Sequence, residues 1–586
     1  MKTSAKFNTA LFLIILVATL FRLLAVNWGL PYRFHDDETN YTEMALRFGI
    51  GKFDPAHFTH GTLYPGILFF VYGLYFLVGK TVGLFSSLDG FMLAYLRDPS
   101  IFSILARLIV NIFSIGTLYL TYLIGKELFN RKVGLLASLF LSFSIIHYMM
   151  SVTGLADIPA VFLLLLSSYL LLKYYFSNQL SAGLRYFWFS GFTLGLAMAA
   201  KLLTAPGVFI YLFIYLYKEK KLSKILNLNL LIGLALVILG FFIAEPFPFI
   251  NPGVFFKTIN NASRYFSGFE KIYTPAFTYF FECLPNALGS ISTCVFFTGI
   301  LYFLHKRTKN ALLILVFPLA HFLPFIKGVG FSYYLLPSLA FICLIISAFL
   351  YEISLKFKRC RVILLYTFTF ICLLSPALNS FRYYLVITSK DTRVIAKEWI
   401  EQNIKKGKSI ILEGALGNEL ILGPKLNEDL ESLQDSLSWT VDQGGSGRFQ
   451  KALIENYDDR GQSYRLYKVS LNFIEEERKD ISNTNADYLV TCGFFDLGLG
   501  HLERFRGKGK LRPETYYQTR QERRDVLAAI EKKFLLIKEI KPFPEFRLFY
   551  PLFFTADYRA LRGIDIFKDR SRISPGPEIK IYERKK

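Results

Sequence analysis

Long apolar runs separated by short charged loops dominate the first 385 residues of this chain. A helix needs roughly 20 mainly apolar residues to cross a bilayer. About eleven stretches have this length and composition, near residues 9–28, 101–125, 133–152, 156–176, 184–200, 203–217, 225–244, 280–304, 310–326, 330–350 and 361–380. The pattern therefore predicts a polytopic α-helical membrane protein with about eleven spans and additional juxtamembrane helices.

The composition supports a membrane protein rather than a soluble enzyme. Of the 586 residues, 53% are hydrophobic, and they include 60 Phe and 35 Tyr, which is too apolar for an ordinary soluble domain. The net charge of +22 could suggest nucleic acid as a partner. Much of the basic excess lies in short loops between apolar runs, where retention of Lys and Arg on the cytoplasmic side explains it. We therefore expect the membrane, and no nucleic acid, as the partner.

Basic clusters in the loops predict the topology. The clusters are Lys2 with Lys6, Lys126 with Arg131 and Lys132, Lys218 to Lys224, His305 to Lys309, and Lys356 to Arg361. All five clusters lie on the same side of the membrane only if the apolar stretch 63–79 does not cross the bilayer. We therefore expect a re-entrant or juxtamembrane helix there. The first apolar run has no small-residue cleavage site and carries Arg22 near its end, which favours a retained span.

We therefore expect an integral protein of a prokaryotic inner or cell membrane, with a cytoplasmic N-terminus and an extracytoplasmic loop 29–62. Beyond about residue 385 the composition becomes a mixture of charged and apolar residues. The segment DTRVIAKEWIEQNIKKGKSIILEG predicts a helix, a turn and a strand, and ADYLVTCG and EIKIYER predict strands. The chain divides into a transmembrane domain, residues 1–384, and an extracytoplasmic α/β domain, residues 385–586, which we expect to bind the acceptor or cover the site.

An acidic cluster, His35-Asp36-Asp37-Glu38, follows the first apolar run. A carboxylate partly shielded at the membrane surface can act as a general base with a raised pKa. Acidic residues also favour the first turn of a helix, and the residues after the cluster have helical spacing. The spacing leaves catalysis and helix capping equally open, and Asp36 fits the cap best.

Asp157 and Lys201 are two further candidate positions, and Asp157 is predicted to lie on the same outer side as Asp37. Asp157 stands between two apolar runs, where a charge is costly unless it is paired or functional. It also precedes Pro159, as a residue at a helix N-terminus does, and both interpretations can hold together. Lys201 ends the apolar run GFTLGLAMAA with no acid nearby in sequence, so we expect its partner to be an anion.

Further polar residues lie at the predicted outer ends of spans. Cations there could hold a lipid-linked phosphate, although snorkelling to headgroups explains any single one. His57 and His60 could form a metal pair, but no third ligand is near, so a contact with acceptor or phosphate is favoured. The cations are Arg107, Lys201, Lys327 and Arg382, with Arg264 in the loop 245–279.

These positions together resemble the motifs of the C-type (GT-C) glycosyltransferases in the protein mannosyltransferase and aminoarabinose transferase group. The family's acidic motif corresponds to Asp37, Glu38, Tyr41 and Glu43, and an Arg in its next span corresponds to Arg107. An Asp-containing turn matches Asp157 to Pro159, and a Gly-Leu-Ala run that ends in Lys matches Gly195 to Lys201. A weaker match is the Tyr-rich segment from Gly330 to Pro337. The resemblance covers roughly residues 1–385. It implies a multi-spanning fold with its acidic motif in the first external loop.

Several differences from the motifs of that group limit which of its activities this chain is expected to share. Asn40 stands where many relatives carry Arg, and the chain lacks the Lys-Pro-Pro sequence of aminoarabinose transferases. It also lacks the Trp-Trp-Asp motif of oligosaccharyltransferases, which disfavours transfer of a whole oligosaccharide. No Asp pair has the D-x-D spacing typical of enzymes that use nucleotide sugars, which favours a lipid-linked donor.

The resemblance implies an inverting transfer of a sugar from a polyprenyl-phosphate donor to an acceptor hydroxyl or amine. In this hypothesis Asp37 is the general base and Glu38 orients the acceptor or shares the proton. The remaining roles are phosphate or substrate binding by Tyr41, His60, Arg107, Lys201 and Arg264, and positioning of the acceptor or of a divalent cation by Asp157. No other cofactor is expected.

Two hypotheses from other classes stay open: a transporter or flippase for lipid-linked or anionic solutes, and a non-catalytic sugar sensor. Transporters often contain inverted repeats with broken helices at the midplane. This chain shows no matching halves, and its acids lie in a loop. The sugar, the acceptor (protein, lipid or glycan), metal dependence and the oligomeric state do not follow from the sequence.

Overall fold

The computed structural model describes most of the first 413 residues and shorter segments after them. The described residues are 2–32, 35–53, 61–219, 227–260, 284–285, 287–306, 309–322, 332–413, 426–442, 451, 454–455, 457, 463–469, 485–491, 532–541 and 579–585. They fall into two compact units, one formed mainly by residues up to Tyr384 and one mainly by residues from Leu385 on.

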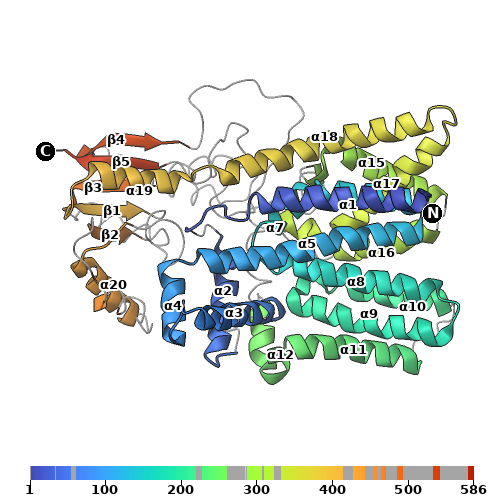
Figure 1. Cartoon of the computed structure of the whole chain (residues 1–586), viewed down its shortest axis with the longest axis horizontal. Helices are drawn as coiled ribbons and strands as arrows, with labels where there is room; N and C mark the ends of the chain where they lie inside the picture. Colours follow the sequence, from blue (N-terminus) through green and yellow to red (C-terminus); the bar gives the residue numbers. More distant parts are fainter. Residues whose placement is uncertain are drawn as a thin grey trace, which may run out of the picture. The chain divides into compact units, whose positions relative to one another are not determined.

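The first unit is helical (Figure 1). Its α-helices are α1 (Lys2–Leu23), α2 (Asp36–Gly49), α3 (Leu63–Thr81), α4 (Leu88–Arg97), α5 (Ser100–Leu128), α6 (Arg131–Ser142), α7 (Ile145–Ser151), α8 (Asp157–Phe176), α9 (Leu180–Ala200), α10 (Gly207–Glu219), α11 (Leu228–Ala244), α12 (Phe247–Ile250), α15 (Ser290–His305), α16 (Lys309–Phe322), α17 (Leu336–Leu355) and α18 (Arg361–Thr388). Two 3₁₀ turns, η1 (Leu202–Thr204) and η4 (Ser332–Leu335), precede α10 and α17.

The apolar runs of the sequence reappear as helices. Within the described residues, six helical segments are long and apolar enough to cross a membrane, and a bent pair makes a seventh. Four shorter apolar helices, Phe7–Leu23, Leu228–Ala244, Ser290–His305 and Leu313–Phe322, coincide with further runs that the sequence predicted as spans. The predicted count of eleven included such short helices, whose 10 to 17 residues would rise only about 15 to 25 Å. The predicted class, a polytopic helical membrane protein, is confirmed.

Two helices differ from the simple pattern. The run 133–152 was expected to be one span, but α6 and α7 meet at a 65° bend. The stretch 63–79, expected to be re-entrant or juxtamembrane, is the continuous helix α3, which also qualifies as a span by its length and hydropathy. The sequence does not reveal the bend because residues 142–144 are Ser, Phe and Ser, with no Gly or Pro to mark a break.

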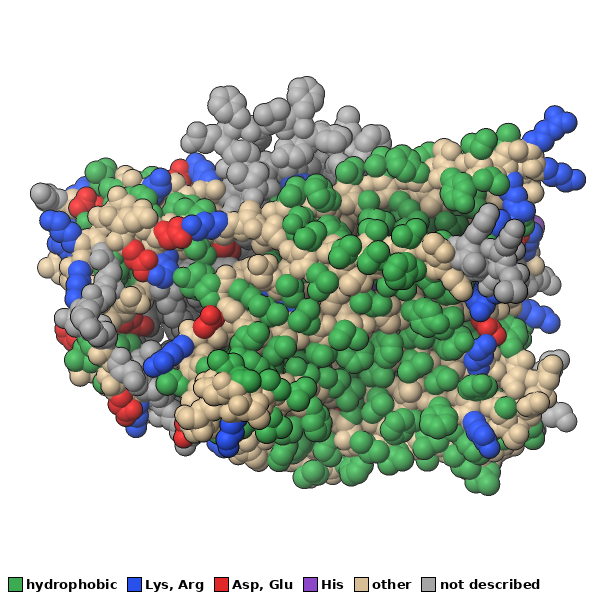
Figure 2. All heavy atoms as spheres, in the orientation of Figure 1, with side chains coloured by type: hydrophobic (Ala, Val, Ile, Leu, Met, Phe, Trp, Pro, Cys, Tyr) green, Lys and Arg blue, Asp and Glu red, His purple; other side chains and the backbone are tan. Residues whose placement is uncertain are grey.

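The described parts of the basic clusters expected to share one side lie at one end of the bundle (Figure 1). The Asn310 amide donates to the carbonyl of Leu128, which joins the start of α16 to the end of α5. Lys218 donates to the carbonyls of Tyr174 and Ser177, which joins the ends of α10 and α8. In Figure 2 Lys and Arg side chains gather at this end, beyond a broad apolar surface. Which side of the membrane this end faces stays a prediction.

Small residues bring α9 and α11 into close contact. A side chain at Gly195 would place its Cβ 2.1 Å from the carbonyl oxygen of Val237, and one at Gly191 would lie 2.6 Å from that of Gly233. Glycine at these positions lets the two helix backbones approach, as small residues do in membrane helix pairs. The contact fixes α9, and therefore Lys201 at its end, against the neighbouring helices.

The second unit contains a five-stranded sheet in the order β2-β1-β3-β5-β4. The strands are β1 (Ser409–Glu413), β2 (Arg465–Val469), β3 (Tyr488–Thr491), β4 (Phe534–Ile540) and β5 (Ile579–Arg584), with helices α19 (Thr392–Asn403) and α20 (Leu430–Asp442). β1 pairs in parallel with β2 and β3, whereas β5 pairs antiparallel with β3 and β4. The small C-terminal sheet domain is confirmed, and α19, β1, β3 and β5 lie in the segments predicted for them.

Candidate functional site

Glu38 and Arg107 form a buried ion pair between α2 and α5. The Arg107 guanidinium donates from Nε to Glu38 Oε1 at 2.7 Å and from Nη2 to Oε2 at 2.8 Å. The side chains are 1% and 0% exposed. Two parallel hydrogen bonds of this kind are the strong geometry for an arginine and a carboxylate. The pair therefore connects the first turn of α2 to the bundle.

Backbone groups complete the surroundings of this pair. Arg107 Nη1 donates to the carbonyls of Val26 and Trp28, each at 2.8 Å, and the Gly154 amide donates to Glu38 Oε1 at 2.9 Å. A Cβ at Gly154 would lie 2.9 Å from that same oxygen and 3.0 Å from the Ala106 Cβ, so a larger residue would have to displace the buried ion pair. Burial opposes ionisation of Glu38, but the Arg107 charge and these hydrogen bonds prevail and lower its pKa below the usual 4.5. Glu38 is therefore ionised at neutral pH.

Asp157 and Lys201 form a second ion pair, and this one reaches the surface. Asp157 is the first residue of α8, and Lys201 follows the last residue of α9. Lys201 Nζ lies 2.6 Å from both Asp157 oxygens, and the two side chains are 19% and 3% exposed. The anion that the sequence suggested for Lys201 is thus Asp157, which is 44 residues away in the sequence.

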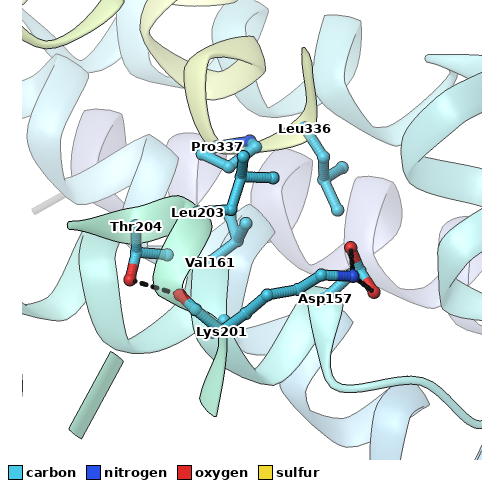
Figure 3. Close-up of a pocket in the computed structure, with 8 residues that line it drawn as sticks. Asp157, Val161, Lys201, Leu203, Thr204, Leu336 and Pro337 are labelled. Atoms are coloured by element: carbon cyan, nitrogen blue, oxygen red, sulfur yellow. Dashed lines mark hydrogen bonds and ion pairs between the residues drawn. The ribbon is translucent and has the colours of Figure 1, made fainter. Parts of the chain in front are cut away.

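A pocket surrounds this second pair. Its lining residues are Asp157, Ala160, Val161, Lys201, Leu203, Thr204, Leu336 and Pro337. Figure 3 shows the Lys201 side chain extended toward Asp157 beneath the apolar side chains of the lining. Lys201 Nζ also lies 5.3 Å from the centre of the Tyr333 ring. The charged pair is therefore surrounded by a lining that is apolar except for Thr204.

Tyr41 connects the acidic motif with the second pair. Burial raises the pKa of its hydroxyl well above 10, and the charges of Asp157 and Asp37 raise it further. Both carboxylates are therefore near enough to act on one hydroxyl, which stays protonated. Asp37 is partly buried, and the Tyr41 ring packs edge-on against Tyr64 at 5.3 Å. The structure thus brings Asp37, Tyr41, Asp157 and Lys201 into one neighbourhood.

The segment that begins at Gly61 is inserted between two helix ends. A Cβ at Gly61 would lie 1.9 Å from the carbonyl oxygen of Ala199, in the last turn of α9. The Thr62 amide and hydroxyl donate to Glu245 Oε2 at 2.6 and 2.7 Å, and the hydroxyl also donates to the carbonyl of Ala244. Glu245 is 4% exposed. The contacts fix the entry to α3 beside Lys201.

Sequence reasoning missed Trp28, Gly61, Gly154 and Glu245. Each acts through backbone contacts with distant segments, and only the acidic Glu245 between apolar helices carried a signal. Among the predicted residues, His57, His60, Arg264 and Lys327 lie outside the described residues, as does the side chain of Asp36. Arg382 is partly buried in α18. No group of three or more His, Cys, Asp and Glu that could hold a metal ion occurs in the described part.

One protein family matches part of the chain. Residues 92–244 match the model of the family described as dolichyl-phosphate-mannose-protein mannosyltransferase. This stretch contains Arg107, Asp157 and Lys201. No curated protein sequence matches the chain. The predicted resemblance to C-type glycosyltransferases of the protein mannosyltransferase group is confirmed by the family match.

Several solved structures have a similar course of the chain at low sequence identity. ArnT from Cupriavidus metallidurans bound to undecaprenyl phosphate is 12% identical, with a TM-score of 0.45 over 83% of this chain and 94% of that one. The apo oligosaccharyltransferase of Archaeoglobus fulgidus is 12% identical, with a TM-score of 0.47 over 99% and 88%. The S. cerevisiae protein O-mannosyltransferase Pmt1-Pmt2 complex bound to the sugar donor is 18% identical, with a TM-score of 0.32 over 40% and 32%. At these scores the similarities assign no substrate to this chain.

Proposed function

We propose that the protein is a membrane glycosyltransferase that moves a sugar from a polyprenyl-phosphate donor to an acceptor hydroxyl or amine, with inversion at the anomeric carbon. The observation that carries the proposal is the Asp157–Lys201 pair in the pocket, together with Tyr41, whose hydroxyl is affected by the charges of both Asp157 and Asp37. The family match supports it because the matched family is described by a dolichyl-phosphate sugar donor. The lipid nature of the donor also fits the apolar lining of the pocket.

The proposed reaction is a single displacement. The Asp37 carboxylate accepts the proton of the acceptor hydroxyl or amine as the acceptor atom bonds to the anomeric carbon. The bond from that carbon to the phosphate oxygen breaks at the same time, and the electron pair leaves with the polyprenyl phosphate. The partly buried position of Asp37 suits a base that must hold its place beside the acceptor.

Lys201 is the cation proposed to stabilise the departing phosphate. Its ammonium has three hydrogens, and Asp157 accepts from it through two oxygens, which leaves one hydrogen for the phosphate. A cation placed in a partly dehydrated pocket stabilises developing negative charge more strongly than in water. Asp157 in turn holds the ammonium in position. A divalent cation at Asp157 would have to displace Lys201, and activity after treatment with EDTA tests for one.

Glu38 and Arg107 are proposed to position the motif. The Arg107 donors already bind Glu38 and two backbone carbonyls, and the side chain is 1% exposed, so a donor phosphate could reach it only if this pair opened. The phosphate role expected for Arg107 is untested, and the geometry favours positioning. Tyr41 is likewise 1% exposed, so its predicted contact with substrate also requires the surrounding side chains to open. His60 and Arg264 keep their predicted contacts with substrate as part of the proposal.

The decisive experiment measures transfer of label from a radiolabelled polyprenyl-phosphate sugar in detergent. Asp37→Asn keeps the shape of the side chain but removes the base, so we expect transfer to fall by at least about 100-fold. The matched control is Asp89→Asn, an exposed acid in α4, which should leave transfer unchanged. Donor binding and the elution volume of Asp37→Asn should equal those of the wild type.

Three outcomes would contradict the proposal. Undiminished transfer by Asp37→Asn would remove the base assignment. Movement of labelled lipid across a vesicle without transfer to any acceptor would indicate a transporter or flippase. Sugar binding without either movement or transfer would indicate a sensor.

A further inference from the structure

Arg22 is a buried cation for which the proposed reaction has no role. It stands in the last turn of α1 and is 1% exposed. Its Nη1 donates to the carbonyl of Ala18 at 2.8 Å, and its Nη2 lies 3.3 Å from the carbonyl of Ser142 and 3.0 Å from His147 Nδ1. No ion pair involves Arg22 within the described ranges. A charge among apolar helices is costly, so its retention suggests a function.

The contacts of Arg22 determine the state of His147. A guanidinium can only donate, so His147 Nδ1 must accept from Arg22. A neutral imidazole then carries its hydrogen on Nε2, which lies 2.7 Å from the Thr117 hydroxyl. That hydroxyl donates onward to the carbonyl of Ser114 at 2.6 Å. His147 therefore serves as a neutral connector between Arg22 and α5.

Arg22 lies at the break between α6 and α7. The carbonyl of Ser142, the last residue of α6, is released by the 65° bend and accepts from the guanidinium. Beyond α7, the Val152 carbonyl accepts from Trp28 Nε1 at 2.8 Å, and the Gly154 amide donates to Glu38. The segment 142–154 is thus contacted by three successive parts of the chain: the end of α1, the turn after it and the start of α2.

We propose that Arg22 is a positioning residue that, through Ser142 and His147, fixes the α6–α7 break and thereby the distance between Asp37 and Asp157. Asp37 precedes Glu38, and Asp157 follows Gly154 by three residues. The hydrogen bond from the Gly154 amide to Glu38 therefore links the segments that carry the two acids. The catalytic consequence rests on the proposed function. The structural consequence, an ordered turn at residues 152–156, does not.

The test compares two pairs of variants in the full-length protein. Arg22→Met removes every donor nitrogen, whereas Arg22→Lys keeps one positively charged nitrogen that can donate. His147→Leu removes the acceptor, whereas His147→Asn keeps an oxygen close to the position of Nδ1. The control is Arg185→Met, an exposed arginine in α9. The readouts are kcat and KM with a polyprenyl-phosphate sugar, amide hydrogen exchange at residues 152–156, and thermal stability in detergent.

We expect Arg22→Met and His147→Leu to lower kcat by about 10- to 100-fold with little change in KM, because a displacement of the base slows the chemical step. Both should speed amide exchange at residues 152–156. His147→Asn should retain kcat within about twofold, since the oxygen restores the acceptor for Arg22, and Arg22→Lys should be intermediate.

Two results would overturn the inference. One is unchanged exchange at residues 152–156 in Arg22→Met. The other is an equal loss of kcat in His147→Asn and His147→Leu, since a role in packing alone would not separate them. If the wild type transfers no sugar, the proposed function fails, and the exchange measurements still decide the role of Arg22.

Discussion

The two ion pairs of the bundle have similar short contacts but opposite surroundings. Arg107 and Glu38 are sealed, at 1% and 0% exposure, and backbone groups occupy further polar atoms of both side chains. Lys201 and Asp157 line a pocket, and Lys201 is 19% exposed. A pair whose polar atoms are already bonded can hold a structure, whereas a pair with a donor at a recess can also meet a ligand. We therefore expect Arg107 and Glu38 to hold the site in shape, and Lys201 and Asp157 to contact the substrate.

Breaking the sealed pair should have the largest effect. Arg107→Met leaves Glu38 buried without its counter-ion, so we expect the free energy of unfolding to fall by about 3–5 kcal/mol, with activity lost as well. Arg107→Lys should also be poor because lysine lacks the two-pronged geometry. Denaturation in mixed detergent measures the loss, with Arg185→Met as the control. A wild-type unfolding curve for Arg107→Met would show that the pair does not hold the fold.

Breaking the pair at the pocket should reduce activity far more than stability. For Lys201→Met we expect transfer to fall by about 100-fold or more, because one stabilising donor is lost from the departing phosphate. Its unfolding free energy should change less than that of Arg107→Met, since the Lys201 side chain is 19% exposed whereas Arg107 is 1% exposed. Lys80→Met, an exposed lysine at the end of α3, is the matched control. Full activity of Lys201→Met would remove its assigned role.

The stability of the protein should depend on pH in the acid range because Glu38 of the sealed pair takes up a proton there. The pKa of Glu38 is lowered in the folded state, so its contribution to stability is complete above the unfolded pKa and is lost as the pH falls through the lower folded value. The loss should begin as the pH falls below the usual pKa of 4.5 and should be absent in Glu38→Gln. Stability curves measured from pH 6 downward test this. Identical acid slopes for the two proteins would contradict it.

An exposed pair in the sheet domain should have the smallest effect. Lys408 lies 2.9 Å from Asp487, and the two side chains are 44% and 38% exposed. Solvent screens such pairs, so Lys408→Met should change neither the transfer rate nor the melting temperature beyond error. Transfer assays and thermal unfolding measure both. A large loss of activity would instead give the sheet domain a role in the reaction.

The sequence predicted the helical class well because apolar runs of span length leave few alternatives. It also selected Asp37, Glu38, Arg107, Asp157 and Lys201, since charges next to such runs are rare. It did not predict their pairing, because partners such as Asp157 and Lys201 are joined only when α8 and α9 pack together.

The roles of backbone groups were not predictable from residue types. The sequence contains no signal that the Gly154 amide binds Glu38 or that α6 ends at Ser142, because each depends on the geometry of distant segments. The strands β2 and β4 were also missed, since their mixed charged and apolar residues resemble those of the neighbouring segments.

The close contact of Gly61 with Ala199 limits how the loop 29–62 can be exchanged in protein engineering. No other residue type fits against that carbonyl without moving α9, so a graft that replaces Gly61 would also shift the backbone that carries Lys201. A loop swap that tests acceptor preference should therefore end before Gly61 and leave Thr62 and Glu245 together. Under this boundary, a change in acceptor can be attributed to the grafted residues themselves.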